Sequence, residues 1–274
     1  MSGLPSASAS SGHSNPHVAV VTGGAKRMGR AISQALAQSG WAVVVHHRRS
    51  PQEAQTLVDS LQKQGHVAEA LALDLDALCP DALDAQFRDI EARLGPVRLL
   101  VNNASRFEFD SAASAHSQGL EAHMRSNLMG PVLCTQALYR HCQRASPPAQ
   151  GHSVGVVVNL LDQKLANPNP DFFSYTLSKA ALQEATHLMA RAFAPTLRVV
   201  GVSPGISLPS ADQTPSEFER AHRLTPLGQS STPEEVADAV VWLAGARAVT
   251  GTTLLVDGGQ HLVPSDRDVM FLSR

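Results

Sequence analysis

The sequence contains few aromatic and few charged residues. Of its 274 residues, eight are Phe, two are Tyr and two are Trp, while Asp, Glu, Lys and Arg together make up 17%, compared with about 25% in a typical soluble domain. The core must therefore be built mainly from Val, Leu, Ile and Ala, and each ring needs its own explanation. Long apolar runs are also missing, since none approaches the ~18 residues that a membrane span requires.

Paired cysteines and an excess of one charge are absent as well. Cys79, Cys134 and Cys142 are odd in number and form no CxxC pair, which argues against a disulfide framework and favours a reducing, cytoplasmic compartment. Lys and Arg number 22 against 24 Asp and Glu, and this balance argues against binding to nucleic acid or an anionic membrane. The twelve histidines show no metal-ligand spacing, so we expect scattered surface histidines and no metal site.

The chain is predicted to form one domain between two tails. Residues 1–16 are rich in Ser, Gly and Pro and contain no Lys or Arg, which fits neither a secretory signal nor a transit peptide and predicts a disordered tail. Seven strands separated by helices are expected within 17–262, and 263–274 is expected to be a C-terminal tail. The predicted strands are His17–Thr22, Trp41–His47, Val67–Leu73, Val97–Asn102, Val154–Leu160, Leu197–Ser203 and Thr252–Val256.

Several of these strands are continuous Val/Leu runs rather than alternating ones, as expected for parallel strands covered on both faces. Together with the intervening helices they predict an α/β, doubly wound, Rossmann-like three-layer sandwich with a seven-stranded parallel sheet. A helix is expected over Arg27–Ser39, and Ser50-Pro51-Gln52-Glu53 predicts a capping box at the start of another. Ala145–His152 and Gly205–Thr232 are read as loops, the second a long polar insertion.

The first strand–helix turn reads Thr22-Gly23-Gly24-Ala25-Lys26-Arg27-Met28-Gly29. In a doubly wound sheet, ligands bind beyond the carboxyl ends of the strands, and glycines at a helix N-terminus let backbone N–H groups approach a phosphate. The motif does not match GxGxxG, and an ordinary glycine-containing turn is the alternative interpretation.

The second strand ends in His46-His47-Arg48-Arg49-Ser50, with no acidic residue to accept hydrogen bonds from an unmodified ribose. Two guanidinium groups and a hydroxyl suit a 2′-phosphate, which favours NADPH over NADH. A solvated basic loop is the alternative.

The first strand–helix turn, Thr22–Gly29, resembles the TGxxxGxG turn of the short-chain dehydrogenase/reductase family. Arg27 stands in place of the middle glycine of that motif, as in pteridine reductases.

Tyr175 and Lys179 lie four residues apart on a predicted helix, so their side chains share one face. A phenol exchanges protons poorly at neutral pH unless a cation stabilises its anion, and Lys179 can supply that charge. A YxxxK pattern alone carries little weight. Its position after the fifth strand matches the family, in which the tyrosine transfers the proton that accompanies the hydride. The resemblance, which covers about 17–262, also assigns Asn127 to the active-site helix and proton relay.

Asp162 stands thirteen residues before Tyr175, where most of the family carries serine. An ionised carboxylate cannot donate a hydrogen bond to a ketone oxygen, but it can pair with a protonated ring nitrogen or help Tyr175 transfer a proton. Imine-like C=N reduction therefore fits better than ketone reduction, and pteridine reductases also carry Asp here. The alternative is a degenerate, inactive site.

The fourth strand is followed by Asn102-Asn103-Ala104-Ser105-Arg106-Phe107. Ser105 and Phe107 match pteridine reductases, in which this ring stacks on the pterin, and a flat heteroaromatic ring suits such a surface. Phe107 as a core or rim residue is the alternative. The loop after Ser203-Pro204-Gly205-Ile206-Ser207 is expected to cover the pocket.

These observations predict an NADPH-dependent reductase of a dihydropterin (dihydrobiopterin, dihydromonapterin or dihydrofolate type), active as a homo-oligomer, with a tetramer implied by the family. A carbonyl or 3-oxoacyl reductase is the nearer alternative and a non-catalytic NADP(H) sensor the more remote one. The expected catalytic residues are Asp162, Tyr175, Lys179 and Asn127, and the expected substrate-binding residues are Arg27, Ser105, Phe107, Asp162 and Tyr175. The expected cofactor-binding residues are Gly23, Arg27, Met28, Gly29, His47, Arg48, Arg49, Ser50, Asp74, Leu75, Asn103, Ala104, Ser105, Tyr175, Lys179, Pro204, Gly205 and Ser207.

Overall fold

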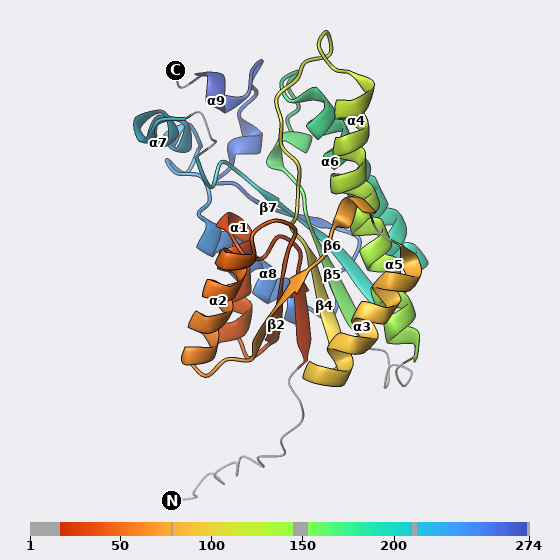
Figure 1. Cartoon of the computed structure of the whole chain (residues 1–274). Coiled ribbons are helices and arrows are strands. Elements are labelled where there is room, and N and C mark those ends of the chain that lie inside the picture. The colour runs from red at the N-terminus through yellow and green to blue at the C-terminus, as the bar shows by residue number, and fades with distance from the viewer. Residues whose placement is uncertain (1–16, 78, 145–152, 210–212, 273–274) are drawn as a thin grey trace, which may run out of the picture.

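A seven-stranded parallel sheet forms the centre of the molecule (Figure 1). The structure is a computed structural model that describes residues 17–77, 79–144, 153–209 and 213–272. The sheet order is β3-β2-β1-β4-β5-β6-β7, so the strand order reverses direction beside β1. The strands are β1 (Val18–Val21), β2 (Ala42–His47), β3 (Ala68–Ala72), β4 (Val97–Asn102), β5 (Gly155–Leu160), β6 (Leu197–Pro204) and β7 (Thr253–Val256).

Helices cover both faces of the sheet, which confirms the predicted three-layer α/β architecture (Figure 1). On one face the apolar core joins the sheet to α1 (Arg27–Gln38), α2 (Pro51–Lys63) and α8 (Pro233–Gly245). On the other it joins the sheet to α3 (Pro80–Leu94), α5 (Gly130–Arg144) and α6 (Phe173–Ala192). Every residue of β1, β2 and β5 is buried, which explains why each of these strands contains a continuous Val-rich run.

The seven predicted strands are confirmed to within one residue at each end. The predicted capping box before α2 is wrong, because the Ser50 side chain makes no capping hydrogen bond. Glu53 instead forms an ion pair with Lys26, whose Nζ lies 2.5 Å from its Oε1. The ion pair between Glu53 and Lys26 thus takes the place of the local capping box between Glu53 and Ser50.

The Gly205–Thr232 insertion contains a helix that the sequence analysis missed, α7 (Pro215–Arg223). It begins at a capping box in which Thr214 and Glu217 bond each other's backbone N–H groups, and Thr232 and Glu235 do the same for α8. The Thr-Pro-x-Glu pattern before each helix was therefore the available signal. The loop predicted at Ala145–His152 lies outside the described residues, as does the predicted tail 1–16.

The remaining elements gather near the carboxyl edge of the sheet. They are the short helices η1 (Leu75–Ala77), η4 (Gln163–Leu165), η5 (Gln260–Leu262) and α9 (Val269–Leu272), together with α4 (Ser117–Met124) and the π-helical turn η2 (Arg125–Met129). None of the helices within the described ranges is long and apolar enough to cross a membrane.

Candidate active site

A cavity of about 590 Å³ opens at the carboxyl ends of β1, β2 and β4. The turn before α1 forms one wall, and its glycines allow a close backbone approach. Gly23 has a φ of +62°, which favours glycine, and a Cβ on Gly29 would collide with the Gly23 carbonyl oxygen and lie 2.6 Å from Asn103 Nδ2. Arg27 also adopts a positive φ of +51°, at the position where the sequence analysis noted an arginine in place of a glycine.

His46 holds this turn against the sheet. The Gly23 N–H donates to His46 Nδ1 at 2.9 Å, and Nε2 lies 2.9 Å from the Leu73 carbonyl oxygen. The ring is therefore neutral, with its proton on Nε2. Burial lowers the pKa of His46 from 6.5 to about 4, against the opposing effect of the Leu73 carbonyl. The side chain is 2% exposed and lines the cavity, so the expectation that the histidines lie on the surface is wrong for His46.

The Arg48 guanidinium lies between two carboxylates at the edge of the same cavity. Its Nε is 3.0 Å from Asp74 Oδ1, and its Nη1 is 2.5 Å from Asp76 Oδ2. The two acids hold the Arg48 side chain in place. Lys26, which is held by its ion pair with Glu53, is a second cation in the lining of this cavity. Asp76 and Lys26 were not selected from the sequence, because nothing local marks Asp76 as a partner of an arginine 28 residues earlier.

The predicted cofactor-binding residues divide into three groups. Those that line this cavity are Gly23, Arg27, Met28, Gly29, Arg48, Leu75, Asn103, Ala104 and Ser105. Those that line the adjoining cavity described next are Arg27, Met28, Tyr175, Gly205 and Ser207. Among the described residues, the predicted ones that line neither cavity are His47, Arg49, Ser50, Asp74, Lys179 and Pro204.

A second cavity of about 440 Å³ adjoins the first and shares Arg27, Met28 and Phe107 with it. Its walls come from η4, the start of α6, the loop after β6 and the residues before and within α9. The loop after β6 contributes Ile206 and Leu208, as predicted for a segment that covers the pocket. Arg27 Nη2 donates to the Pro209 carbonyl oxygen at 2.9 Å, which ties this loop to the turn before α1.

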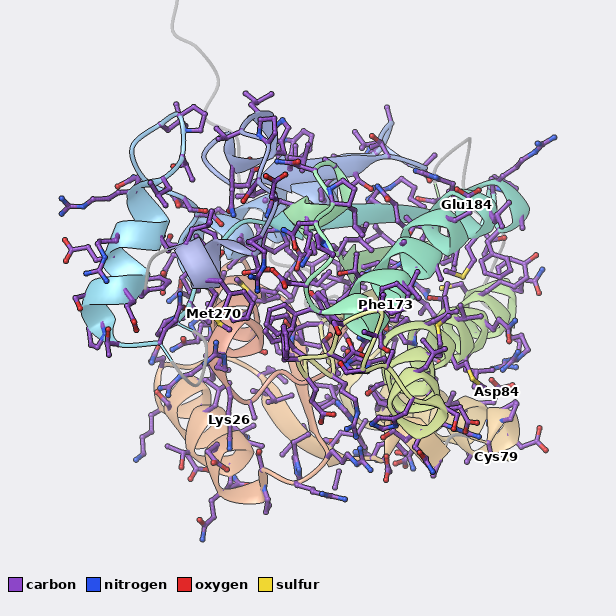
Figure 2. All side chains as sticks on the ribbon, turned by 90° about the horizontal axis from the view of Figure 1, so that it is seen from above. Lys26, Cys79, Asp84, Phe173, Glu184 and Met270 are labelled. Carbon is purple, nitrogen blue, oxygen red and sulfur yellow. The ribbon has the colours of Figure 1, made fainter. Side chains whose placement is uncertain are left out.

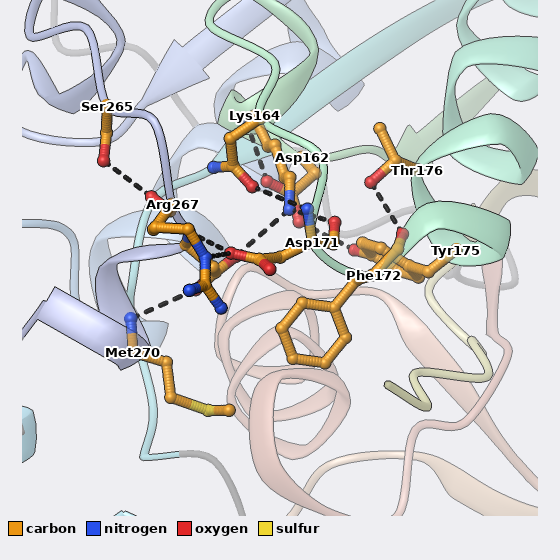
Figure 3. Close-up of polar contacts among 11 residues, drawn as sticks. Asp162, Lys164, Asp171, Phe172, Tyr175, Thr176, Ser265, Arg267 and Met270 are labelled. Carbon is orange, nitrogen blue, oxygen red and sulfur yellow. Dashed lines mark hydrogen bonds and ion pairs between the residues drawn. The ribbon is translucent and has the colours of Figure 1, made fainter. Parts of the chain in front are cut away.

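Tyr175 and Asp162 form a hydrogen-bonded pair in the second cavity (Figure 3). The Tyr175 hydroxyl donates to Asp162 Oδ2 at 2.8 Å, and Asp162 Oδ1 accepts the Lys164 N–H at 2.8 Å. Burial raises the pKa of Asp162. Burial, followed by the Asp162 charge, raises the pKa of Tyr175 well above 10. Both shifts favour the protonated forms, so the pair can hold a proton close to a bound ligand.

Lys179 lies one helical turn after Tyr175, as the spacing predicts, and is 3% exposed. Its Nζ donates to the Leu160 carbonyl oxygen at 2.6 Å and lies 5.8 Å from the centroid of the Tyr175 ring. Burial lowers the pKa of Lys179 to about 8, against the opposing charge of Asp162. The ammonium therefore contacts a carbonyl at the end of β5 rather than the phenol itself.

Asn127 links the walls of the site from the π-helical turn η2. Its Oδ1 accepts the Arg106 N–H at 2.7 Å, and its Nδ2 donates to Ser178 Oγ at 2.9 Å. Ser178 in turn donates to the Tyr175 carbonyl oxygen at 2.6 Å. Such π-helical turns are frequent at functional sites, and this one fixes the loop after β4 relative to α6.

Phe107 lies where the two cavities meet and is 46% exposed. Its ring stacks on Phe172 at 4.2 Å between centroids and meets Tyr175 edge-on at 4.7 Å. Phe172 adopts a φ of +53°, a strained conformation for a bulky residue. The structure thus places Phe107 beside Tyr175 at the rim of both cavities, with Phe172 behind it.

Several residues of the second cavity were missed from the sequence. They are Gln163, Lys164, Gln260, Asp268, Val269 and Met270. Four follow the seventh strand, and 268–270 lie within the part expected to be a C-terminal tail. Their only local signal was the apolar Val269-Met270-Phe271-Leu272 run, which is too short to indicate where it packs.

Comparison with known proteins gives matches over nearly the whole chain. A family model described as enoyl-(acyl carrier protein) reductase matches residues 23–261. Pteridine reductase 1 of Leishmania tarentolae is 31% identical over 279 residues, which cover 89% of this chain and 96% of that protein. The 3beta-hydroxysteroid dehydrogenase 1 of Eggerthella lenta is 32% identical over 261 residues, which cover 89% and 94%.

Two solved structures share this fold over more than nine-tenths of the chain. The crystal structure of FolM alternative dihydrofolate reductase 1 from Brucella suis in complex with NADP has a TM-score of 0.82 and 36% identity, with 91% of this chain and 96% of that chain covered. The corresponding protein from Brucella canis, also complexed with NADP, has a TM-score of 0.83 and 35% identity, with 93% and 97% covered.

Proposed function

Because this chain belongs to the short-chain dehydrogenase/reductase family, it is an oxidoreductase, and we propose that it uses NADPH to reduce the C=N bond of a dihydropterin. The observation that carries the proposal is the half-buried Asp162 carboxyl, which accepts the Tyr175 hydroxyl at 2.8 Å in the second cavity. The Leishmania tarentolae relative is named a pteridine reductase, and the Brucella neighbours are named alternative dihydrofolate reductases.

The residues of the first cavity fit NADPH. Gly23 and Gly29 keep the turn before α1 free of side chains, so the pyrophosphate would lie against the helix N-terminus. Arg48 and Lys26 supply positive charge at the rim for the 2′-phosphate. The complexes of both Brucella neighbours with NADP support this choice. When bound, the cofactor supplies a hydride.

The chain's own residues would manage the proton. Reduction of a C=N bond adds a hydride to carbon and a proton to nitrogen. Tyr175 and Asp162 favour their protonated forms, so the pair can donate that proton, and water can restore it. Lys179 holds its ammonium at the end of β5, behind the phenol, where it counters the negative charge left on the pair after transfer.

The carboxyl group supports reduction of a C=N bond over reduction of a ketone. A ketone reductase needs a hydroxyl that donates to the carbonyl oxygen throughout the reaction, whereas Asp162 can donate only in its acid form and, once it is ionised, can only accept. Asp162 can bond a protonated ring nitrogen as an anion and can donate as an acid. Phe107 adds a flat apolar surface beside it, which suits a heteroaromatic ring better than a flexible acyl chain.

The test is NADPH oxidation by the purified protein with dihydrobiopterin, compared with an aromatic ketone and a 3-oxoacyl thioester. We expect turnover with the dihydropterin, at least a 100-fold loss in kcat for Tyr175→Phe on removal of the proton donor (about 10²–10⁴-fold for general acid catalysis), and little change for Tyr139→Phe, the other tyrosine of the chain.

Asp162→Ser separates the alternatives further. It should impair dihydropterin reduction and improve ketone reduction, because it restores a hydroxyl donor. Turnover of a ketone without turnover of any pterin would refute the proposal in favour of a carbonyl or 3-oxoacyl reductase. Tight NADPH binding without turnover of any substrate would refute it in favour of a non-catalytic NADP(H) sensor.

A further inference from the structure

The last described residues form a wall of the second cavity instead of leaving the fold. We define residues 263–272 as the C-terminal segment. Seen from above, its Met270 lies on the same side of the molecule as Lys26 of the first turn, away from Asp84 of α3 (Figure 2). Asp268, Val269 and Met270 line the cavity that holds Tyr175 and Asp162.

Asp171 anchors this segment. Its carboxylate is 5% exposed, and its Oδ2 accepts Arg267 Nε at 2.8 Å and the Asp268 N–H at 2.7 Å (Figure 3). Farther along the chain, Met270 packs against Phe172 and Tyr175, and the Phe271 ring meets Phe109 edge-on at 5.4 Å. These contacts fix the segment beside the catalytic pair.

Asp268 differs from Asp171 because it lines the cavity and is 20% exposed. Among the described residues, its side chain accepts two contacts. Oδ1 accepts the Met270 N–H at 3.1 Å, and Oδ2 lies 3.3 Å from Lys164 Nζ. A carboxylate has about four acceptor positions, and a 3.3 Å contact is long for a charged pair. Acceptor capacity therefore remains at the cavity wall.

Lys164 connects Asp268 to the catalytic pair. Its backbone N–H donates to Asp162 Oδ1 at 2.8 Å, while its buried Nζ donates to the Asp171 carbonyl oxygen at 2.5 Å and pairs with Asp268. The two carboxyl groups are thus held by one residue on one wall. An acyl chain placed there would strip water from Asp268 without replacing its hydrogen bonds, which is costly. A ring edge that carries N–H groups would replace them.

We propose that Asp268 is a specificity-determining residue that accepts hydrogen bonds from the amino and ring N–H edge of the substrate heterocycle, and so selects amino-substituted rings over rings and chains that lack these donors. The inference rests on the proposed reductase function and assigns a role to the C-terminal segment, which completes the site from within the same chain.

The experiment compares a dihydropterin with the same dihydro ring that carries hydrogen in place of the amino group. The wild-type protein should prefer the amino compound in kcat/KM by about tenfold or more, the range expected for a hydrogen bond to a charged group. Asp268→Ala should bring this ratio close to one, mainly by raising KM for the amino compound. Asp268→Asn, which keeps an acceptor but no charge, should retain part of the preference.

A matched variant separates recognition from a general effect of charge. Asp266→Asn changes an exposed acid of the same segment and should leave the ratio unchanged. NADPH affinity, measured by fluorescence titration, should be unchanged in Asp268→Ala and confirms that the variant is folded.

The results also distinguish this inference from the proposed function. An unchanged ratio in a folded Asp268→Ala protein that still reduces dihydropterins overturns the role of Asp268 and leaves the proposed function standing. If the wild-type protein reduces ketones and no pterin, the proposed function fails, and the role of Asp268 falls with it.

Discussion

Acidification should weaken the turn before α1 through a single histidine, His46. Its Nδ1 accepts the Gly23 N–H, and its Nε2–H donates to the Leu73 carbonyl oxygen. A proton on Nδ1 would remove the acceptor and place a charge on a side chain that is 2% exposed. Protonation therefore breaks the link between the turn and the strand and carries a desolvation cost.

The size of the effect follows from the pKa of His46, which burial lowers from 6.5 to about 4. Between these values the unfolded chain binds more protons than the folded chain, so the free energy of unfolding rises with pH over this window and falls as the pH drops below 6.5. At pH 5 His46 is protonated in most unfolded molecules but in few folded ones. The free energy of unfolding is therefore about 2 kcal/mol lower at pH 5 than at pH 7.

The assay is urea unfolding at pH 7 and pH 5 for the wild-type protein and for His46→Gln, which cannot titrate. The stability lost between the two pH values should be smaller by about 2 kcal/mol in the variant, whatever the absolute stability of the variant at pH 7. His187→Gln, which changes an exposed histidine, serves as the control and should behave like the wild type. Equal losses in the wild type and His46→Gln, within about 0.5 kcal/mol, would refute the reasoning.

Three other measurements probe the turn, the core and the catalytic pair. Gly29→Ala should abolish NADPH binding in calorimetry, because its Cβ would collide with the Gly23 carbonyl oxygen; wild-type affinity would contradict this. Arg198→Leu should lower the free energy of unfolding by about 3 kcal/mol, because Arg198 donates to three carbonyl oxygens at and after the end of α8. Urea unfolding measures this loss, and an unchanged midpoint would contradict the prediction. Burial raises the pKa of Asp162, so its acid form persists to higher pH than in an ordinary aspartic acid, and kcat for dihydropterin should fall as the pH rises through that pKa. Asp162→Asn should remove this limb from the pH profile, and a limb that persists would assign it to another group.

Most of the fold was predictable because it depends on local patterns. The buried strands β1, β2 and β5 each contain a continuous Val-rich run, and runs of this kind predicted the strands to within one residue at each end. Local patterns failed where a distant partner competed. Glu53 fits a capping box by spacing, yet Lys26 takes its carboxylate. Helix α7 was missed although Thr214 and Glu217 carry the pattern that starts α8.

The candidate active site shows the same division. The spacing of Tyr175 and Lys179 placed both residues on one face of a helix, and Asp162 was recognised by its distance from Tyr175 along the chain. Their ionisation was not readable, because burial raises the pKa values of both Asp162 and Tyr175, and the charge and hydrogen bond of Asp162 raise that of Tyr175 further. The sequence suggested that Lys179 stabilises a phenolate, and the structure adds that its Nζ donates to the Leu160 carbonyl oxygen and lies 5.8 Å from the centroid of the Tyr175 ring.

The sequence alone determined the strand and helix pattern, the glycine turn and the main reactive side chains, since these depend on residue type and on spacings of a few residues. Tertiary structure decided which groups meet across long separations. It brought His46 to Gly23, Asp76 to Arg48, and Asp268 to Lys164, which is 104 residues earlier in the chain. Such contacts arise because parallel strands deliver their carboxyl ends to one edge of the sheet, and no local pattern specifies which residues of distant loops meet there.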